Sequence, residues 1–465
     1  MLDQGKLMLG SKSNRSGLLA RRDVLRVGGL MGLGLTLPEL IQTRLTAAGG
    51  STFGKAKQVI MLFLHGGHPQ QETFDPKPDG PQEVRGPFKA ISTSVPGTQF
   101  CELLPQLSKH ADKLAVVRSM THGNTNHVQA CLPAQTGHQH PETLRSRGDF
   151  PPNDTDFPPL GAVVDHLRGS GSSLPAWVRI GPLMRRSNGT TLHGQTPGFL
   201  GSGHSSFAVD QKLLGDDVEI EALKNPAGLD DVRLTERANL RRQFNSYTQQ
   251  LQELGETQRL SPYFERAVSL LASRKTKAAF DLSQEKPELR QAYGQTEFGQ
   301  RCLLARRLAE AGVPMINISY CHTPAGSWDT HSQNAKKMKD SLAPTLDQSV
   351  SALLTDLQQR AMLDETLVVI NAEFGRTPAI NKNQGRDHWP FVYSLALAGA
   401  GVQGGAVYGK SDKSAAYPLE KPRAPADMAA TIYHLLGIDP ATRIYDSAER
   451  PHSLIIGSPI EELLA

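Results

Sequence analysis

Five short segments of the chain are mostly apolar, and each has the length of a β-strand. They are rich in β-branched residues and do not alternate with polar positions, which favours strands over helices and buries both of their faces. Strands buried on both faces are typical of a parallel sheet. The five segments are residues 59–64, 114–117, 315–320, 366–370 and 393–398.

Two amphipathic stretches separate some of these strands. Residues 297–311 have helical character and stop at Gly312, a residue that often ends helices. Residues 341–363 carry leucine and valine at helical spacing. Strands that alternate with helices predict an α/β fold in which helices cover both faces of a doubly wound, mostly parallel sheet.

Two other regions interrupt this alternation. Residues 215–295 are charged and rich in glutamine, with few strand signals, so we expect a helical insertion there. Residues 141–210 are rich in glycine, proline and serine and are expected to be mostly loops. The chain shows no internal repeat, and we expect residues 49–465 to form one large domain.

The first 48 residues have the pattern of an export signal. Arg21 and Arg22 precede a short apolar run that is interrupted by glycines, and Ala47-Ala48 provides small residues for cleavage. An arginine pair followed one residue later by two apolar residues resembles the twin-arginine signal. The alternatives are a basic amphipathic terminus or an uncleaved anchor, although the apolar run is shorter than the roughly 20 residues that span a bilayer.

The leader also explains the basic balance of the chain. It holds seven basic and three acidic residues, so its excess of four positive charges equals that of all 465 residues. The remainder is close to neutral, which argues against nucleic acid as a partner and leaves membrane contact to the leader alone. Four widely spaced cysteines form neither metal-binding pairs nor a disulfide scaffold.

Histidine and carboxylate residues gather just after the predicted strands. Because parallel strands end at one edge of a sheet, these residues are expected to meet there. Imidazoles and carboxylates are ligands for divalent metals, which can polarise a phosphoryl or sulfuryl oxygen. The strand-end residues are His65, His68, Glu72, Asp75, His322, Asp329, His331, Glu373, Arg376, Asp387 and His388.

Each of these residues also has a purely structural interpretation. Asp329 can form an Asp turn with a capping role, Glu373 can form a salt bridge with Arg376 or Arg386, and His388 can be a core or capping residue. The weakest single candidates are the histidines in polar loops, namely His65, His68, His122, His138 and His140.

Several motifs, taken together, resemble an exported, sulfatase-like family of unknown function within the alkaline phosphatase and sulfatase superfamily. The resemblance covers about residues 57–440. It is carried by Phe74-Asp75-Pro76-Lys77-Pro78, Arg85-Gly86-Pro87-Phe88, Arg118-Ser119-Met120-Thr121-His122, Trp328-Asp329-Thr330-His331, Glu373-Phe374-Gly375-Arg376-Thr377-Pro378 and Gly385-Arg386-Asp387-His388-Trp389-Pro390.

The resemblance implies an alkaline phosphatase-like fold and a metal centre, but it also reveals two departures. The superfamily nucleophile begins a helix that ends in Thr-Gly, and counting back ten residues from Gly137 places His127 there, so formylglycine chemistry is not supported. Glu373 and Phe374 occupy the places of a paired Asp and His, so one metal position is depleted.

By this resemblance, Asp329, His331 and His388 form a metal site, and Glu373 and Asp75 lie towards a second position. Asp387 is a further metal candidate beside His388, and Arg376 or Arg386 would hold anionic oxygens. The metal would be zinc, calcium or magnesium. His127 is open to four roles, as nucleophile, general acid or base, metal ligand, or structural residue, and the helix N-terminus should keep its ring neutral.

Two functions follow from these residues. The first is a metal-dependent hydrolase of phosphate or sulfate esters that acts in the periplasm or at the cell surface on an anionic substrate, including a sulfated or phosphorylated glycan. The second is a non-catalytic relative that keeps the fold to bind a metal or a glycan.

The leader provides the first test. Replacing Arg21-Arg22 by Lys-Lys should block export and removal of residues 1–48, because the twin-arginine machinery recognises the arginine pair itself. Fractionation of cells that express the double variant measures this, and normal export of the variant would contradict the prediction.

Overall fold

The computed structural model describes residues 52–141, 149–215, 218–224, 233, 236, 261–320 and 328–465. The predicted signal at residues 1–48 lies outside these residues. Among the described helices, none combines the length and the apolar character that crossing a membrane requires.

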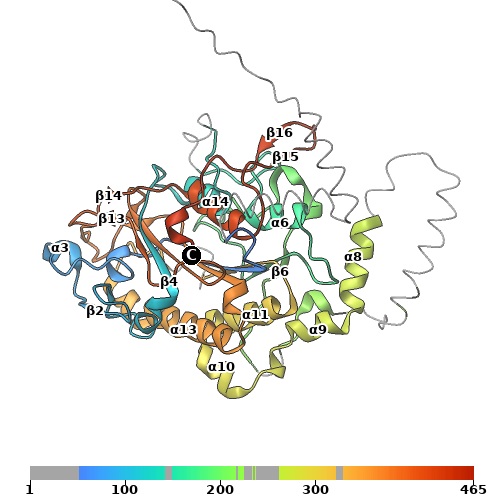
Figure 1. The fold of residues 1–465 in the computed structure, drawn as a ribbon, viewed down its shortest axis with the longest axis horizontal. Coiled ribbons are helices and arrows are strands. Elements are labelled where there is room, and N and C mark those ends of the chain that lie inside the picture. Colours follow the sequence, from blue (N-terminus) through green and yellow to red (C-terminus); the bar gives the residue numbers. More distant parts are fainter. Residues whose placement is uncertain are drawn as a thin grey trace, which may run out of the picture. The chain divides into compact units, whose positions relative to one another are not determined.

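An eight-stranded sheet runs through the described chain (Figure 1), in the order β12-β4-β11-β8-β1-β7-β5-β6. Neighbouring strands are parallel except where β11 pairs with β4 and β8, so the predicted mostly parallel α/β sheet is confirmed. Its strands are β1 (Gln58–Phe63), β4 (Leu114–Met120), β5 (Trp177–Ile180), β6 (Phe207–Val209), β7 (Met315–Ser319), β8 (Thr366–Asn371), β11 (Tyr393–Ala398) and β12 (Val407–Tyr408).

One predicted strand has the opposite direction to its neighbours. Between β8 and β11 the chain forms a two-stranded hairpin, β9 (Gly375–Arg376) with β10 (His388–Trp389), and no helix. A parallel return needs a crossover connection, usually a helix, so β11 enters the sheet from the edge at which β8 ends. Residues 372–392 therefore remain at the carboxyl edge of the parallel strands.

Helices cover both faces of the sheet, as expected for a doubly wound fold. Alternate residues of β1 point to opposite sides: Ile60 and Leu62 join one buried cluster, and Val59 and Met61 join the other. The helices of the first cluster are α9 (Arg274–Phe280), α10 (Pro287–Tyr293), α11 (Glu297–Ala311) and α13 (Ala343–Gln359); those of the second are α6 (Leu160–Leu167) and α14 (Pro425–Leu435), with α4 (His127–Thr136) against α14.

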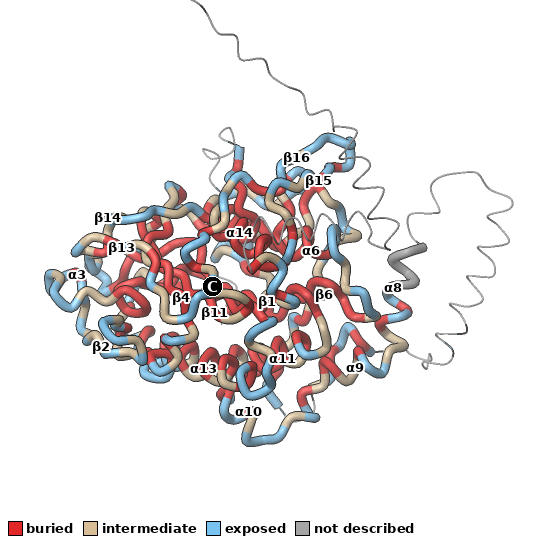
Figure 2. The backbone as a smooth tube through the Cα atoms, in the orientation of Figure 1, coloured by how far each residue is buried: buried red, intermediate tan, exposed pale blue. Residues whose placement is uncertain are grey.

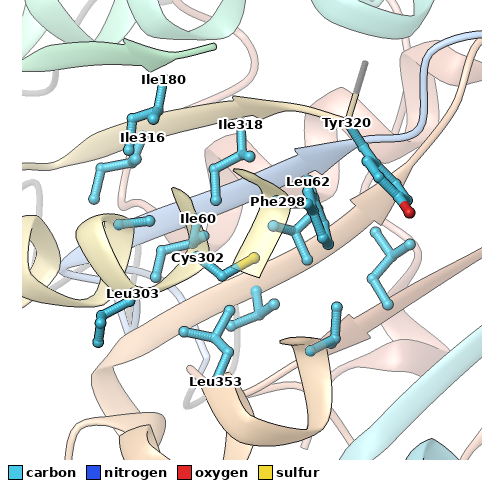
Figure 3. Close-up of a cluster of buried hydrophobic side chains, with 14 of the residues drawn as sticks. Ile60, Leu62, Ile180, Phe298, Cys302, Leu303, Ile316, Ile318, Tyr320 and Leu353 are labelled. Carbon is cyan, nitrogen blue, oxygen red and sulfur yellow. The ribbon is translucent and has the colours of Figure 1, made fainter. Parts of the chain in front are cut away.

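The first cluster forms a continuous apolar layer between the sheet and α11. Ile316 and Ile318 of β7 face Cys302 and Phe298 of α11 (Figure 3), and the rings of Phe298 and Tyr320 stack with their centroids 4.0 Å apart. Figure 2 shows that the buried residues concentrate in the central strands and on the inward sides of the helices. The cysteines Cys101, Cys131 and Cys302 are buried free thiols, and Cys321 lies outside the described residues.

The described part of region 141–210 is mostly loop, as expected, but it also contributes regular elements. It contains α6 and the strands β5 and β6, which extend the sheet on one side. All four residues of β5 are buried, and its one charged side chain, Arg179, pairs with Asp210 at 2.6 Å. Strand β5 is short and lies among glycine, serine and proline residues, so the sequence around it does not show a clear strand pattern.

The remaining elements lie at the periphery. The described part of the predicted insertion is helical at α8 (Ser261–Ala272), α9 and α10, whereas residues 225–260, apart from 233 and 236, lie outside the described set, so the insertion stays a prediction. The other small elements are α3 (Gln82–Arg85), β2 (Ala90–Ser92), β3 (Gln99–Cys101), α12 (Asn334–Lys337), β13 (Lys410–Ser411), β14 (Pro418–Glu420), β15 (Arg443–Tyr445) and β16 (Pro451–Ser453).

The start of α11 provides a test of the fold. The Thr296 hydroxyl accepts a hydrogen bond from the Gly299 amide at 3.1 Å and so caps the helix. Thr296→Ala should lower the free energy of unfolding by about 1 kcal/mol, measured by chemical denaturation, whereas Thr296→Ser keeps the acceptor and should stay close to the unsubstituted protein. Equal stability of all three chains would contradict the assignment of this cap.

Candidate metal centre

Five residues from four chain segments meet at the carboxyl edge of the sheet, two of them from residues 372–392. His65 follows β1, Glu373 follows β8, and His127 begins α4 after β4. Asp329 comes from the segment after β7, and His388 comes from β10. Because β11 is antiparallel, the hairpin before it reaches the same edge, which brings His388 to residues that follow parallel strands.

The carboxylate of Asp329 lies at the middle of this group. Its Oδ1 is 3.0 Å from His331 Nε2 and 3.1 Å from His388 Nε2, and these two nitrogens are 3.0 Å apart. Its Oδ2 is 3.4 Å from Nε2 of His127. Three imidazoles therefore present the same ring nitrogen to one carboxylate.

The other nitrogen of each ring is held by an oxygen. His388 donates its Nδ1–H to the Thr125 carbonyl at 2.7 Å, and His331 donates to Asp387 at 2.6 Å. His127 donates its Nδ1–H to Glu373 Oε1 at 2.7 Å. Imidazoles that bind metals are oriented in this way, since an outer acceptor fixes the tautomer and leaves the inner nitrogen as a lone pair.

A buried arginine holds Asp329 in place. Arg376 pairs with His388 across the β9–β10 hairpin, and its Nη2 donates to Asp329 Oδ1 at 2.6 Å. Its remaining donors bond the carbonyl oxygens of Gly66, Gly67 and Arg386. The guanidinium is fully buried and has no donor directed to solvent, so it positions the carboxylate rather than a substrate.

The start of α4 is fixed by an N-cap. The Asn126 side chain accepts a hydrogen bond from the Val128 amide at 2.8 Å, and Gly137 ends the helix in the left-handed conformation. The helix therefore begins at His127, the position obtained by counting back from Gly137. The His127 ring is buried, with its centroid 4.3 Å from that of His388.

The pKa values of Asp329 and His127 are set by their neighbours in the centre. Burial alone would raise the pKa of the Asp329 carboxyl, but hydrogen bonds to three imidazoles and the Arg376 guanidinium hold that pKa well below its usual range. Burial lowers the pKa of His127, but Asp329 and Glu373 more than offset this and raise it. The two carboxylates therefore shift the pKa of His127 in the direction opposite to the one expected from the dipole of the ten-residue helix.

A second group of ligand atoms lies directly beside the first. His65, His127 and Glu373 are buried, and one ligand atom of each lies within 4.8 Å of the others. Among the described residues, neither Nδ1 of His65 nor Oε2 of Glu373 has a hydrogen-bond partner. Burial lowers the pKa of His65 to about 4, so its ring is a neutral donor of a lone pair.

The geometry and the donor types fit zinc. Ligand atoms that lie 2.0–2.1 Å from a tetrahedral ion are about 3.3 Å apart, close to the spacing among Asp329, His331 and His388. Mixed imidazole and carboxylate ligands suit zinc, whereas calcium and magnesium prefer shells made of oxygen. The unpartnered lone pairs of His65 and Glu373 add further donors for a cation.

The centre opens to solvent on the side of His331. The His331 side chain is 44% exposed and that of Asp387 is 51% exposed, compared with 5% for His127. On the inner side, the Phe374 ring packs against both His127 and His388, with centroids 4.9 and 4.5 Å away. Phe374 therefore forms an apolar wall of the site.

Three candidate residues lie in other contacts. Asp75 pairs with Lys77 at 2.9 Å and Arg118 at 3.6 Å and does not reach the imidazoles. Arg386 is fully buried and donates to Glu72 at 2.8 Å and to main-chain carbonyls, so it cannot hold substrate oxygens. Asp387 contacts the centre only through His331 and orients that ring.

Two histidines that the sequence ranked among the weakest candidates, His65 and His122, contact the site. His65 belongs to the second group of ligand atoms, and His122 Nε2–H donates to the Glu373 carbonyl at 2.6 Å. His65 directly follows a buried strand, as Glu373 nearly does, and this shared position was the available signal. His122 had no comparable signal, because its partner is a main-chain oxygen.

Removing the central carboxylate tests the metal centre. The purified mature protein should bind zinc, and Asp329→Asn and His388→Asn should each weaken binding by more than the roughly 10–100-fold that loss of an outer partner costs. Zinc titration after chelation measures the affinity, with circular dichroism to check the fold. Asp412→Asn changes a carboxylate that caps its own turn and is the matched control. Unchanged zinc affinity in both site variants would exclude the centre.

Comparison with known proteins places the chain in a family. No curated protein matches the sequence. Solved structures that are similar in fold include the following three. Ps i-CgsB is 11% identical over 86% of this chain and 74% of its own, with a TM-score of 0.41, and the PsFucS1 sulfatase from Pseudoalteromonas sp. is 14% identical over 92% of this chain and 75% of its own, with a TM-score of 0.40. The phosphonate monoester hydrolase SpPMH from Silicibacter pomeroyi is 12% identical over 88% of this chain and 76% of its own, with a TM-score of 0.36. At these TM-scores the likenesses carry no argument about activity. The expected family of unknown function is confirmed: residues 56–464 match one family model, and the chain belongs to the family described as Protein of unknown function (DUF1501).

Proposed function

We propose that the protein is a metal-dependent hydrolase that cleaves phosphate or sulfate esters outside the cytoplasm. The observation that carries the proposal is the convergence of three imidazole Nε2 atoms on the Asp329 carboxylate at the carboxyl edge of the sheet. Export is proposed from Arg21-Arg22 and the apolar run that follows them.

Asp329, His331 and His388 would hold the ion, and zinc is the metal that suits them best. The bound ion would supply Lewis-acid polarisation of the phosphoryl or sulfuryl oxygen. Arg376 holds Asp329 from the buried side, and Asp387 keeps the Nε2 of His331 directed inward. These two residues position ligands and do not touch the substrate.

His127 and Glu373 have the arrangement of a general base and its orienting carboxylate. Glu373 accepts the Nδ1–H of His127, so the Nε2 that faces the centre can take a proton. In the proposed reaction, water loses a proton to His127 Nε2 and its oxygen attacks phosphorus or sulfur. The bond to the ester oxygen then breaks, the alkoxide that leaves takes a proton from solvent to become the alcohol, and the His127 imidazolium returns its proton to solvent. Glu373 stabilises the imidazolium in the same way that the carboxylate of a hydrolase triad does.

The substrate enters from the exposed side of His331. Both arginines that were expected to hold its oxygens are buried and engaged, so recognition of the anion falls to the ion and to the half-exposed imidazole. The substrate is an anionic ester, with sulfated and phosphorylated glycans among the candidates.

The second candidate function is binding of a metal or a glycan without catalysis. One observation favours it: the first residue of α4 is His127, and this position carries no serine, threonine or cysteine hydroxyl or thiol. A bound ion without a nucleophile would then serve recognition alone. The two functions differ in turnover and not in metal content.

The two functions can be separated by an assay of the zinc-loaded mature protein with p-nitrophenyl phosphate and p-nitrophenyl sulfate, followed by a panel of sulfated and phosphorylated sugars. We expect turnover that chelation removes and zinc restores. His127→Ala should lower kcat by about 10²–10⁴, the usual contribution of a general base, and leave the zinc content unchanged.

Asp412→Asn is again the control and should keep full activity. If His127→Ala loses zinc as well as activity, His127 is a ligand and not the base. Full zinc occupancy with no turnover of any ester would instead establish the non-catalytic function.

A further inference from the structure

A second cluster of metal-ligating side chains lies outside the centre described above and shares no residue with it. It consists of His140, in the segment after α4, Asp156, in the loop before α6, and His193, which follows the bridge between Arg185 and Thr191. One ligand atom of each residue lies within 4.8 Å of those of the other two, and all three residues are buried.

Both imidazoles have an outer acceptor on the same ring nitrogen. His193 donates its Nε2–H to the Phe150 carbonyl at 3.0 Å, and His140 directs its Nε2 to the Val128 carbonyl at 3.4 Å. Donation from Nε2 leaves Nδ1 as a lone pair. This is the tautomer that a metal-binding imidazole adopts when a main-chain oxygen fixes its other nitrogen.

The closest contact in the cluster requires a cation. His193 Nδ1 lies 2.5 Å from Asp156 Oδ2, so a lone pair and a carboxylate oxygen face each other in a buried space. The cation between them is either a proton on the ring or a metal ion. A proton needs only these two atoms, whereas a metal also uses the third ligand, and the His140 ring stands at 83° to the His193 ring with centroids 4.4 Å apart.

We propose that His140, Asp156 and His193 form a structural site for a divalent transition metal such as zinc. Two imidazoles and one carboxylate are typical zinc ligands and leave the fourth tetrahedral position for water. The Phe150 ring packs at 5.2 and 4.8 Å from the two imidazoles and shields one side, while Asn153 donates to Asp156.

The ion would join three loops that are far apart in the sequence. It would tie the segment after α4 to the loop before α6 and to the turn that carries His193. Because His140 contacts the carbonyl of Val128, the site also braces the first turn of α4, next to His127. The role is structural, and its loss should lower stability rather than turnover directly.

Zinc stoichiometry tests the proposal in the full mature protein. The protein is first stripped with a chelator and then titrated with zinc. The single variant Asp329→Asn should still bind about one ion. The double variant, which carries His193→Asn as well, should bind none. His193→Asn and Asp156→Asn alone should each bind one ion fewer than the unsubstituted protein and lose the rise in Tm that zinc produces. His452→Asn changes a single histidine–aspartate pair and is the matched control, with zinc uptake unchanged.

Unchanged zinc stoichiometry in both His193→Asn and Asp156→Asn would overturn the proposal, because a proton alone then lies between the two side chains. A second measurement does not depend on the folding of any variant. Crystals of the unsubstituted protein grown with zinc should give an anomalous difference peak among the three side chains at the zinc absorption edge, and a cluster without that peak would also overturn it.

Discussion

The candidate metal centre depends on the hydrogen bonds and ion pairs of the Asp329 carboxylate. A negative charge in a largely buried position is costly unless it is paired, and here one buried guanidinium and three imidazoles share it. Close backbone packing makes this sharing geometrically feasible. A Cβ on Gly66 would lie 2.3 Å from the Asp329 amide nitrogen, and one on Gly385 would lie 2.0 Å from the His331 carbonyl, so larger residues at either position would push the loops apart. The φ of Gly66, +109°, also excludes most other residues.

The direction of one strand decides which residues reach this carboxylate. If β11 were parallel to β8, the connection would cross the sheet and start again at the opposite edge, and His388 would lie far from Asp329. The β9–β10 hairpin instead turns at the carboxyl edge and pairs Arg376 with His388, so a cation and an imidazole approach Asp329 from adjacent strands. The antiparallel direction of β11 is thus what keeps the β9–β10 hairpin, with Arg376 and His388, beside Asp329.

Much of the architecture could be predicted from the sequence because the central strands are continuous apolar runs and α11 has both a cap and a terminal glycine. The place of the site followed from the rule that parallel strands end together, whereas His127 was singled out by the family resemblance, which counts ten residues back from Gly137. Side-chain direction was not predictable in this way. Arg376, Arg386 and Asp75 have the types and positions expected of site residues, yet their charges are used by partners far along the chain, such as Glu72 for Arg386. Strand β5 escaped prediction because four residues give too short a pattern.

His127 limits what the centre can do, because an imidazole has only two nitrogens. Its Nδ1 is held by Glu373, which itself is fixed by the Gly66 amide at 2.8 Å. Only Nε2 remains, and it faces the oxygen of Asp329 that the other imidazoles do not contact. That lone pair can bind a cation or accept a proton from water, but it cannot do both at once. Because His331 and His388 already present their Nε2 atoms to the other oxygen of Asp329, an ion can be held there without His127. The proposed proton transfer by His127 therefore depends on this division of one carboxylate between its two oxygens.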